Sequence, residues 1–561
     1  GGARWELGSA GMAHLVIGPL LRYVSDVAAT VWLEADAACR VEVLGHATET
    51  FRVNGRHYAI VAVTGLDPGS SVSYEVLLDG VRRWPAADGE WPPSLIRTLP
   101  RTGTRGLDVV FGSCRVSRPN RPPYTLGPDE HELGTGVDAL WALACRMRGQ
   151  EPDRWPHVLL LLGDQVYADE VPPETAEFIR GRRDVSRPPG LEVADFEEYA
   201  RMYREAWADP TVRWLLSTLP SAMIFDDHDV HDDWNTSASW IAEMRTESWW
   251  PDRIAGALST YWIYQHLGNL PPEALETDPL LARVRAAPDA GALLREFALA
   301  ADCEGGGGLW SYSRDLVGTR LVVLDGREGR VLEETHREMF DETEWSWVLE
   351  QVTGDFDHLV IATTLPVLLP PSFHYLEALS EPLCSGAWGR VAARAGEWLR
   401  RTFDLEHWAA FESSFRRLLV LTREVGAGRR GPAPASILFL GGDVHQGYLH
   451  EAAFPPGAGV RSAVYQAVCS PFRNPLNRSE RTVLETVRRS RVIGRVVRRL
   501  AHLVGVADPE ATWRLVQDPT FENQLATLGL DGRRATLRIE RTHPGDGADP
   551  GLHTTLDRRL V

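Results

Sequence analysis

The chain has 561 residues, of which 44% are hydrophobic and 24% charged, so it is long enough to form two or more domains. Its formal net charge of -18 argues against general nucleic-acid binding, because phosphate backbones attract basic surfaces. All 59 lysine-or-arginine positions are arginine, which excludes Walker-type phosphate loops and lysine Schiff-base enzymes.

The ends of the chain and its cysteines say little about export. The six cysteines are scattered without CxxC spacing, so we expect no disulfide framework. Residues 1–11, which precede Met12, resemble an expression scar. No run reaches the ~18 apolar residues of a membrane span. We expect a cytoplasmic protein, although an exported protein whose signal had been removed would have the same sequence.

Residues 12–100 have the texture of a small all-β domain. Short runs of alternating hydrophobic residues are separated by Gly, Pro, Asn and Asp turn signals. The clearest runs are ATVWLEA, CRVEVLG, YAIVAVTGL and SVSYEVLLDG. We predict an antiparallel β-sandwich of the immunoglobulin or fibronectin kind.

Residues 106–540 change to apolar strand runs that alternate with helical stretches, which predicts a layered α/β domain. The runs are LDVVFGSCR from 107, HVLLLLGDQVY from 157, AMIFDDHD from 222, TRLVVLDGR from 319, DHLVIATTLP from 357 and SILFLGGDVH from 436. Nearly all of them end in polar residues. Because parallel strands present their carboxyl ends at one edge, these polar residues are expected to meet there.

Helical segments surround these strands. Tryptophan-rich insertions at 237–300 and 375–425 are predicted to form walls around the strand ends. The stretch 483–505 predicts one basic amphipathic helix, which either docks on the domain or binds a membrane surface. Residues 541–561 are assigned to a tail.

Three strand ends carry side chains that suit a metal. Asp164 follows four leucines and a glycine, and Tyr167 comes three positions later. The pairs Asp227–His228 and Asp443/His445 stand in the same context. A carboxylate in such a place either bridges cations or caps the following turn. Three coincidences of the same kind favour the metal.

Cys114 ends a fourth strand, in VVFGSCR. It is either a buried core cysteine, a phosphatase nucleophile or a metal ligand. The nucleophile needs C-x5-R, and Arg121 comes one position too late. As a ligand, the Cys114 thiolate would favour a soft or highly charged transition ion, and Tyr167 as a phenolate would favour ferric iron.

Together these motifs resemble the alkaline phosphatase D (PhoD-like) family of the calcineurin-like metallophosphatase superfamily. The resemblance covers residues 15–475 and rests on GPLLRYVSDVAATVWLEA, FGSCR, GDQVYAD, FDDHD, VVLDGR and GGDVHQG. It implies a four-layer α-β-β-α metallophosphoesterase domain, preceded by a β-sandwich and containing a bimetal centre. Ser113–Cys114–Arg115 replaces the usual D-x-H motif, and the middle histidine motif has no equivalent.

The resemblance also implies ligands for two metals. One site would use Cys114, Asp164, Tyr167 and His445, a set that suits Fe³⁺. The other would use Asp164, Asp227 and Asp443, oxygen donors that suit Ca²⁺, with Mn²⁺, Mg²⁺ and Zn²⁺ as alternatives. His228 would then protonate the leaving group, and Arg115 would hold the substrate phosphate.

The predicted function is hydrolysis of small phosphoric esters, as a phosphodiesterase, an alkaline phosphomonoesterase or both, by a metal-activated hydroxide at a dinuclear centre. One alternative is a related hydrolase with a manganese or zinc pair. The other is a non-catalytic metal-containing binding protein on the same fold. The sequence leaves the substrate and the oligomeric state open.

Overall fold

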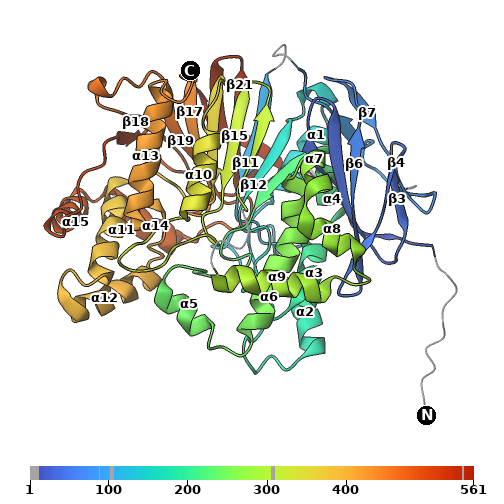
Figure 1. Ribbon diagram of the computed structural model, residues 1–561, viewed down its shortest axis with the longest axis horizontal. Helices are drawn as coiled ribbons and strands as arrows, with labels where there is room; N and C mark the ends of the chain where they lie inside the picture. The colour runs from blue at the N-terminus through green and yellow to red at the C-terminus, as the bar shows by residue number, and fades with distance from the viewer. Residues whose placement is uncertain (1–11, 87–88, 102–105, 305–309, 546–548) are drawn as a thin grey trace.

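The computed structural model describes residues 12–86, 89–101, 106–304, 310–545 and 549–561 (Figure 1). The segment 1–11, interpreted above as an expression scar, lies outside the described residues. Among these described residues, no helix is both long enough and apolar enough to cross a bilayer.

The N-terminal strands form the predicted β-sandwich. One sheet has the order β1-β2-β6-β5, a second β4-β3-β8-β9, and β7 pairs with β10. The strands are β1 (Leu15–Val24), β2 (Ala28–Ala35), β3 (Arg40–Val43), β4 (His46–Glu49), β5 (Phe51–Val53), β6 (Arg56–Thr64), β7 (Ser71–Ser73), β8 (Val76–Leu78), β9 (Val81–Trp84) and β10 (Leu95–Arg97). Alternate side chains point inward, so Val41, Val61 and Leu78 fill the space between the sheets.

A six-stranded sheet follows, in the order β13-β12-β11-β21-β22-β23. Its strands are β11 (Leu107–Gly112), β12 (Val158–Leu162), β13 (Ser221–Ile224), β21 (Gln524–Asp531), β22 (Arg534–His543) and β23 (Gly551–Arg559). The first three are parallel and the last three antiparallel. The assignment of 541–561 to a tail was wrong, because β23 completes the sheet by pairing with β22.

A seven-stranded sheet has the order β14-β15-β16-β17-β19-β18-β20. Its strands are β14 (Tyr312–Leu316), β15 (Thr319–Leu324), β16 (His358–Thr363), β17 (Ser436–Gly441), β18 (Gly447–Ala453), β19 (Ala463–Cys469) and β20 (Thr512–Leu515). Strands β15, β16, β17 and β19 are parallel. The six runs read from the sequence therefore divide equally between two sheets.

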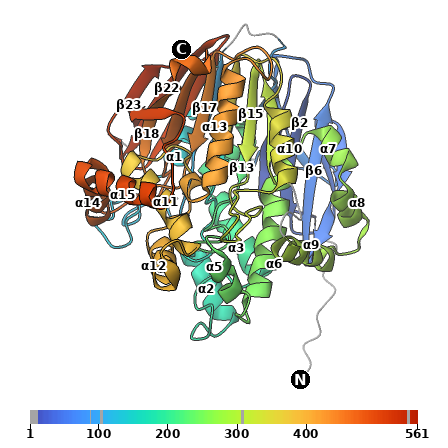
Figure 2. The same ribbon diagram turned by 60° about the vertical axis from the view of Figure 1, so that its left-hand side comes forward.

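The two sheets pack face to face, with helices on both outer faces (Figures 1 and 2). Helices α1 (Ala139–Arg148) and α4 (Pro210–Thr218) belong to the core of the six-stranded sheet. Helices α10 (Glu342–Gln351) and α13 (Glu412–Gly426) cover the seven-stranded sheet. This gives the predicted four layers, α-β-β-α.

The remaining helices wall the carboxyl ends of the strands or pack beside the sandwich. They are α2 (Pro173–Arg182), α3 (Phe196–Trp207), α5 (Ala238–Met244), α6 (Trp250–Thr260), α7 (Pro272–Thr277), α8 (Pro279–Ala286), α9 (Gly291–Glu304), α11 (Pro371–Cys384), α12 (Gly389–Thr402), α14 (Arg478–Arg489) and α15 (Arg491–Leu503). The single helix expected over 483–505 is two helices, because Ser490 is extended (ψ 100°) and its hydroxyl accepts a hydrogen bond from the Ile493 amide of α15.

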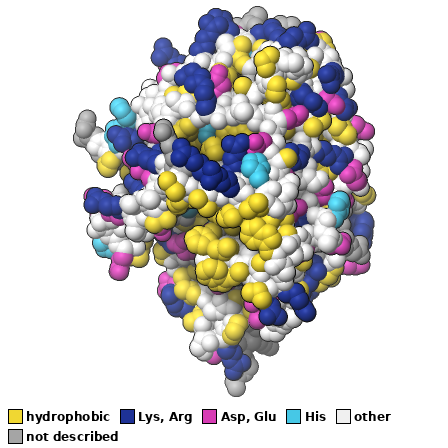
Figure 3. Space-filling view, turned by 90° about the vertical axis from the view of Figure 1, so that its left-hand side faces the viewer, with side chains coloured by type: hydrophobic (Ala, Val, Ile, Leu, Met, Phe, Trp, Pro, Cys, Tyr) yellow, Lys and Arg dark blue, Asp and Glu magenta, His cyan; other side chains and the backbone are white. Residues whose placement is uncertain are grey.

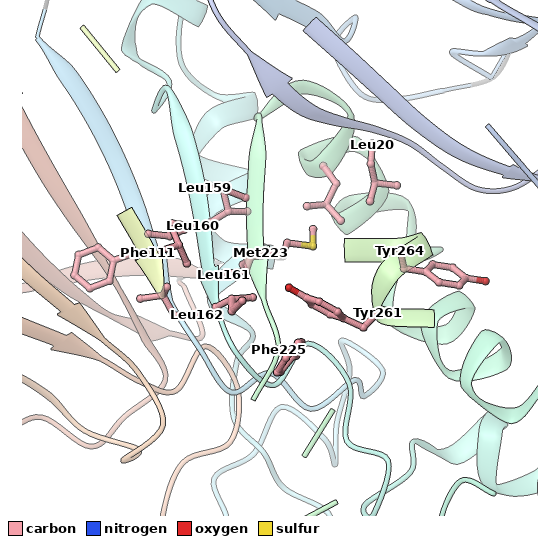
Figure 4. Packing of buried hydrophobic residues seen from close by; sticks show 14 of the residues in the cluster. Leu20, Phe111, Leu159, Leu160, Leu161, Leu162, Met223, Phe225, Tyr261 and Tyr264 are labelled. Atoms are coloured by element: carbon pink, nitrogen blue, oxygen red, sulfur yellow. The ribbon is translucent and has the colours of Figure 1, made fainter. Parts of the chain in front are cut away.

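The four leucines of β12, Leu159–Leu162, are buried on both faces of the sheet. Figure 4 shows them between Phe111 of β11 and Met223 of β13, with Tyr261 and Tyr264 of the helical insertion beyond. A strand enclosed on both faces must be apolar throughout, which explains the unbroken leucine run. The first polar side chain that β12 can present comes after its end.

Candidate metal centre

Two glycine–aspartate turns bring carboxylates from different sheets together. Gly163–Asp164 follows β12, and Gly442–Asp443 follows β17. A Cβ atom on Gly442 would lie 2.4 Å from the Oγ atom of Ser113, so only glycine allows the two sheets to approach this closely. The Ser113 hydroxyl in turn accepts a hydrogen bond of 2.9 Å from the Asp443 amide.

Several residues at these strand ends adopt left-handed backbone conformations. The φ values are 57° for Cys114, 51° for Asp164, 63° for Asp443 and 49° for His445. Such conformations cost a non-glycine residue about 1 kcal/mol or more and cluster at functional sites. The surrounding sheets hold all four residues in this geometry.

The structure gathers four carboxylates into one buried cluster. One carboxylate oxygen from each of four residues lies within 4.8 Å of the other three: Asp164, Asp226, Asp227 and Asp443. Three of these residues were predicted as ligands. Asp226 was not predicted, although it directly precedes Asp227 in the sequence.

The cluster is short of positive charge and of hydrogen-bond donors. Within the described part of the chain, Asp164 Oδ1, Asp226 Oδ2 and Asp227 Oδ1 are buried and accept no hydrogen bond. Burial, reinforced by neighbouring carboxylates, raises the pKa of Asp164 and of Asp226 well above the usual range. Buried anionic oxygens without partners are costly, and cations would satisfy them. The donors present therefore fit a metal ion.

Arg327 supplies part of the missing charge. Its buried guanidinium forms ion pairs with Asp226 and with Glu406, and it lies 3.2 Å from Asp227 Oδ1. Asp325, two positions before it, accepts the backbone amide of Arg327. Arg330 also pairs with Glu406, so two guanidiniums lie among five carboxylates.

Cys114 and Tyr167 approach the cluster from one side. Cys114 Sγ lies 3.2 Å from Asp164 Oδ2, and the Tyr167 hydroxyl lies 3.4 Å from the same oxygen. Burial and the nearby Asp164 carboxylate raise the pKa of the Cys114 thiol well above its usual value. The thiol is therefore protonated unless a strongly charged cation displaces the proton.

His228 lies beside the carboxylates with its ring oriented from two directions. Its Nδ1 atom lies 2.8 Å from Asp169 Oδ2, and its ring stacks on Tyr167 at 4.6 Å between centroids. Burial would lower the pKa of His228, but the Asp169 and Asp227 carboxylates outweigh burial and raise the pKa well above its usual value. The imidazole is thus held as a proton donor.

Asp229 positions two of the turns without joining the cluster. Its Oδ2 atom accepts the backbone amides of Asp164 and Asp226, both at 2.9 Å, while Gln265 donates to Oδ1. Burial raises the pKa of Asp229 to about 7. One carboxylate therefore fixes the turn after β12 to the turn after β13.

On the other side, His445 and His407 flank Asp443. Burial lowers the pKa of His445 to about 4, so its ring is neutral and able to bind a metal. His407, which the sequence did not indicate, lies 3.2 Å from Asp443 Oδ2 through Nε2 and 2.7 Å from Glu377 through Nδ1. His407 directly precedes the short 3-10 helix Trp408–Ala410 in the second tryptophan-rich insertion.

Arg115 does not reach the cluster, which corrects its predicted role in holding phosphate. Its Nε and Nη2 atoms donate to Asp138 Oδ2 at 2.9 and 2.7 Å, and its Nη1 atom donates to the Ala206 carbonyl. Asp138 is also the N-cap of α1. Arg115 therefore anchors α1, and its side chain faces away from the metal centre.

A cavity of about 320 Å³ opens onto the cluster. Its polar wall includes Asp164, Asp227, His228, His407, Asp443 and His445. Its outer wall comes from helical segments and includes Phe373, Phe403, Leu484 and Arg488. Arg488 is nearly buried, and its Nε and Nη2 atoms form no hydrogen bond within the described residues.

Comparisons with known proteins agree with this architecture. Residues 144–283 match the family model of the PhoD-like phosphatase, and residues 12–96 match a domain of unknown function (DUF7800). No curated protein matches the chain.

Two solved structures are similar. The structure of PhoD has 12% sequence identity and a TM-score of 0.58, over 99% of this chain and 93% of that chain. Purple acid phosphatase PPD1 from yellow lupin (Lupinus luteus) seeds has 10% identity and a TM-score of 0.47, over 96% and 74%. The family-model match confirms the resemblance seen in the sequence over residues 144–283, and the likeness to PhoD is one of fold.

Proposed function

We propose that this protein is a metal-dependent hydrolase of small phosphoric esters. The observation that carries the proposal is the convergence of Asp164, Asp227 and Asp443 from three strand ends, where Asp164 Oδ1 and Asp227 Oδ1 are buried and accept no hydrogen bond within the described residues. The PhoD-like phosphatase domain supports the same chemistry. A cavity large enough for a small ester opens onto these oxygens.

The donor set supports two different cations. Cys114, Asp164, Tyr167 and His445 would hold Fe³⁺, and Asp164, Asp227 and Asp443 would hold Ca²⁺, with Asp226 close enough to contribute. When bound, such a pair supplies positive charge to the phosphoryl oxygens and lowers the pKa of a water molecule. The raised pKa of Cys114 favours a highly charged ion at its site.

His228 is the proposed proton donor to the leaving group. It lines the cavity, and its Nδ1 atom is engaged by Asp169, so the Nε2 atom is the one available to a substrate. The raised pKa of His228 keeps this nitrogen protonated at neutral pH. A protonated imidazole can neutralise the alkoxide as the ester bond breaks.

The outer wall of the cavity supports substrates with an organic ester group. Phe373, Phe403 and Leu484 offer apolar surface to the organic group. The unpaired Nε and Nη2 atoms of Arg488 would donate to a second anionic oxygen of the substrate. Arg488 thus takes the substrate-binding role that was predicted for Arg115. Both phosphomonoesters and phosphodiesters fit this description.

Turnover of aryl phosphomonoesters and phosphodiesters tests the proposal. The untreated protein should hydrolyse at least one of them, lose activity with a chelator and regain it with iron and calcium. Restoration by manganese or zinc alone would favour the alternative metal pairs. Absence of turnover under every metal condition would favour a non-catalytic binding protein.

A further inference from the structure

Helix α12 carries an exposed apolar stripe. Trp388, just before it, and Val391 and Trp398 within it have exposed fractions of 47%, 83% and 62%. Their spacing of three and seven residues places them along one side of the helix. The other side packs on α11, where a Cβ on Gly396 would lie 3.1 Å from Cys384 Sγ. The stripe therefore points away from the protein.

Helix α15 has two apolar stripes instead of one. Its inner stripe, Val497, Leu500, Ala501 and Val504, packs against Tyr375 and Leu379 of α11. Its outer stripe is exposed: Val492 by 68%, Val496 by 49% and Leu503 by 74%. A helix that only docked on the domain would need the inner stripe alone.

Arginines surround both exposed stripes. Helices α14 and α15 together contain eight arginines and two glutamates, whereas the whole chain has a net charge of -18. On the described part of α12 and α15, four exposed arginines form neither an ion pair nor a hydrogen bond: Arg390, Arg394, Arg495 and Arg499. We call the exposed surface of α12, α14 and α15 the basic helical face. Figure 3 shows it with hydrophobic side chains gathered near its centre and basic side chains around them.

We propose that the basic helical face docks on an anionic lipid bilayer. Tryptophan, phenylalanine and aliphatic side chains would enter the headgroup region, while the arginines would meet lipid phosphates, each contributing about 1 kcal/mol near the surface. Aliphatic side chains such as Val391 and Leu503 have no use on a nucleic-acid backbone. A second copy would bring the same positive face against itself, which electrostatic repulsion opposes.

The docked surface adjoins the metal centre. Phe403, which follows α12 and is 57% exposed, also lines the cavity, as do Leu484 and Arg488 of α14. Docking would therefore place one edge of the cavity mouth next to the bilayer. Helix α14 and the segment that follows α12 therefore belong both to the cavity wall and to the region of the docking face.

Co-sedimentation with vesicles tests this inference. The full chain should pellet with vesicles of equal parts phosphatidylcholine and phosphatidylglycerol, and far less with phosphatidylcholine alone or at high salt. The variant Arg495→Glu/Arg499→Glu should lower the partition coefficient at least tenfold, and Trp398→Ala about threefold or more. The matched control is Arg40→Glu/Arg283→Glu, two exposed arginines on the sandwich side, which should bind as the parent does.

The thermal unfolding midpoint should stay unchanged in all these variants, which shows that they fold. The inference is overturned if the parent does not prefer anionic vesicles, or if both charge-reversal variants bind equally. It is also overturned if sedimentation without lipid shows a dimer that Trp398→Ala separates, or if a single-stranded oligonucleotide binds the face in preference to the vesicles. Vesicle binding is measured without turnover, so its outcome does not depend on the proposed enzyme activity.

Discussion

Arg22 and Arg327 are both fully buried, yet they lie in opposite surroundings. Arg22 of β1 reaches from the sandwich to the α/β domain and donates to the carbonyls of Ser221, Tyr264 and Gln265 at 2.7 to 3.2 Å. Arg327 stands among carboxylates that it cannot satisfy, and several of their oxygens accept no hydrogen bond within the described residues. A buried polar group whose neighbours are satisfied indicates structure, whereas one with unsatisfied neighbours indicates a binding site.

The largest effect is expected among the carboxylates around Arg327, several of whose oxygens lack hydrogen-bond donors within the described residues. Asp164→Asn removes a charge from the oxygen cluster, so metal content should fall and kcat/KM should drop by about 10³ or more. Metal analysis and turnover on an aryl phosphoester measure both. The control is Asp325→Asn, a buried aspartate that also follows a strand but accepts backbone amides from Arg327 and Glu328. It should retain its metal; equal losses in both variants would contradict the assignment.

At the satisfied end, Arg22→Met should cost about 3 kcal/mol of unfolding free energy, because three buried carbonyls lose their donor. Chemical denaturation measures this loss. Metal content per folded molecule should not change. The exposed Arg82, which pairs with Glu75, provides a control: Arg82→Met should cost less than about 1 kcal/mol. Loss of metal in Arg22→Met would contradict the assignment of Arg22 to stability alone.

The buried His266, which lies near Arg22, should make the unfolding free energy depend on pH. Burial, and then the nearby Arg22 charge, lowers the pKa of His266 to about 4, against about 6.5 in an unfolded chain. Protons therefore bind the unfolded chain more readily, and stability is lost as pH falls from about 6.5 to about 4, by on the order of 3 kcal/mol. His266→Phe should remove this part of the acid sensitivity. If the unfolding free energy falls equally in parent and variant from pH 7 to pH 4.5, His266 is not responsible for the acid sensitivity.

The smallest effect is expected for His407, which acts on the metal centre through Asp443. His407→Asn removes the contact with Asp443 Oδ2, so metal affinity should fall about 10- to 100-fold. Titration of the chelated protein measures it. Glu377→Gln, which reaches Asp443 only through His407, should weaken binding less. An affinity unchanged in both variants would mean that His407 does not position the ligand.

Much of the site could be predicted because its residues follow buried strands. The apolar runs before Asp164, Asp227 and Asp443 had to be strands enclosed on both faces, and their first polar residues had to lie at the sheet edge. The apolar runs do not determine which strands pair, so the assignment of each strand to one of the two sheets and the pairing of β23 came only from the structure.

The residues that were missed or misassigned depend on long-range packing. His407 lies in a tryptophan-rich insertion without a leading strand, and its partners are 30 and 36 positions away in sequence. Arg115 directly follows Cys114 in the sequence, but its guanidinium binds Asp138, the N-cap of α1. A residue that is adjacent in sequence to a ligand has its backbone near the site, but its long side chain can point elsewhere.

Anomalous scattering from crystals of the untreated protein tests the central claim most directly. Two peaks should appear beside Asp164, one towards Cys114 and Tyr167 with the iron absorption edge, and one towards Asp227 and Asp443. Peaks elsewhere, or a cluster whose carboxylates are satisfied by ordered water with no ion between them, would contradict the account.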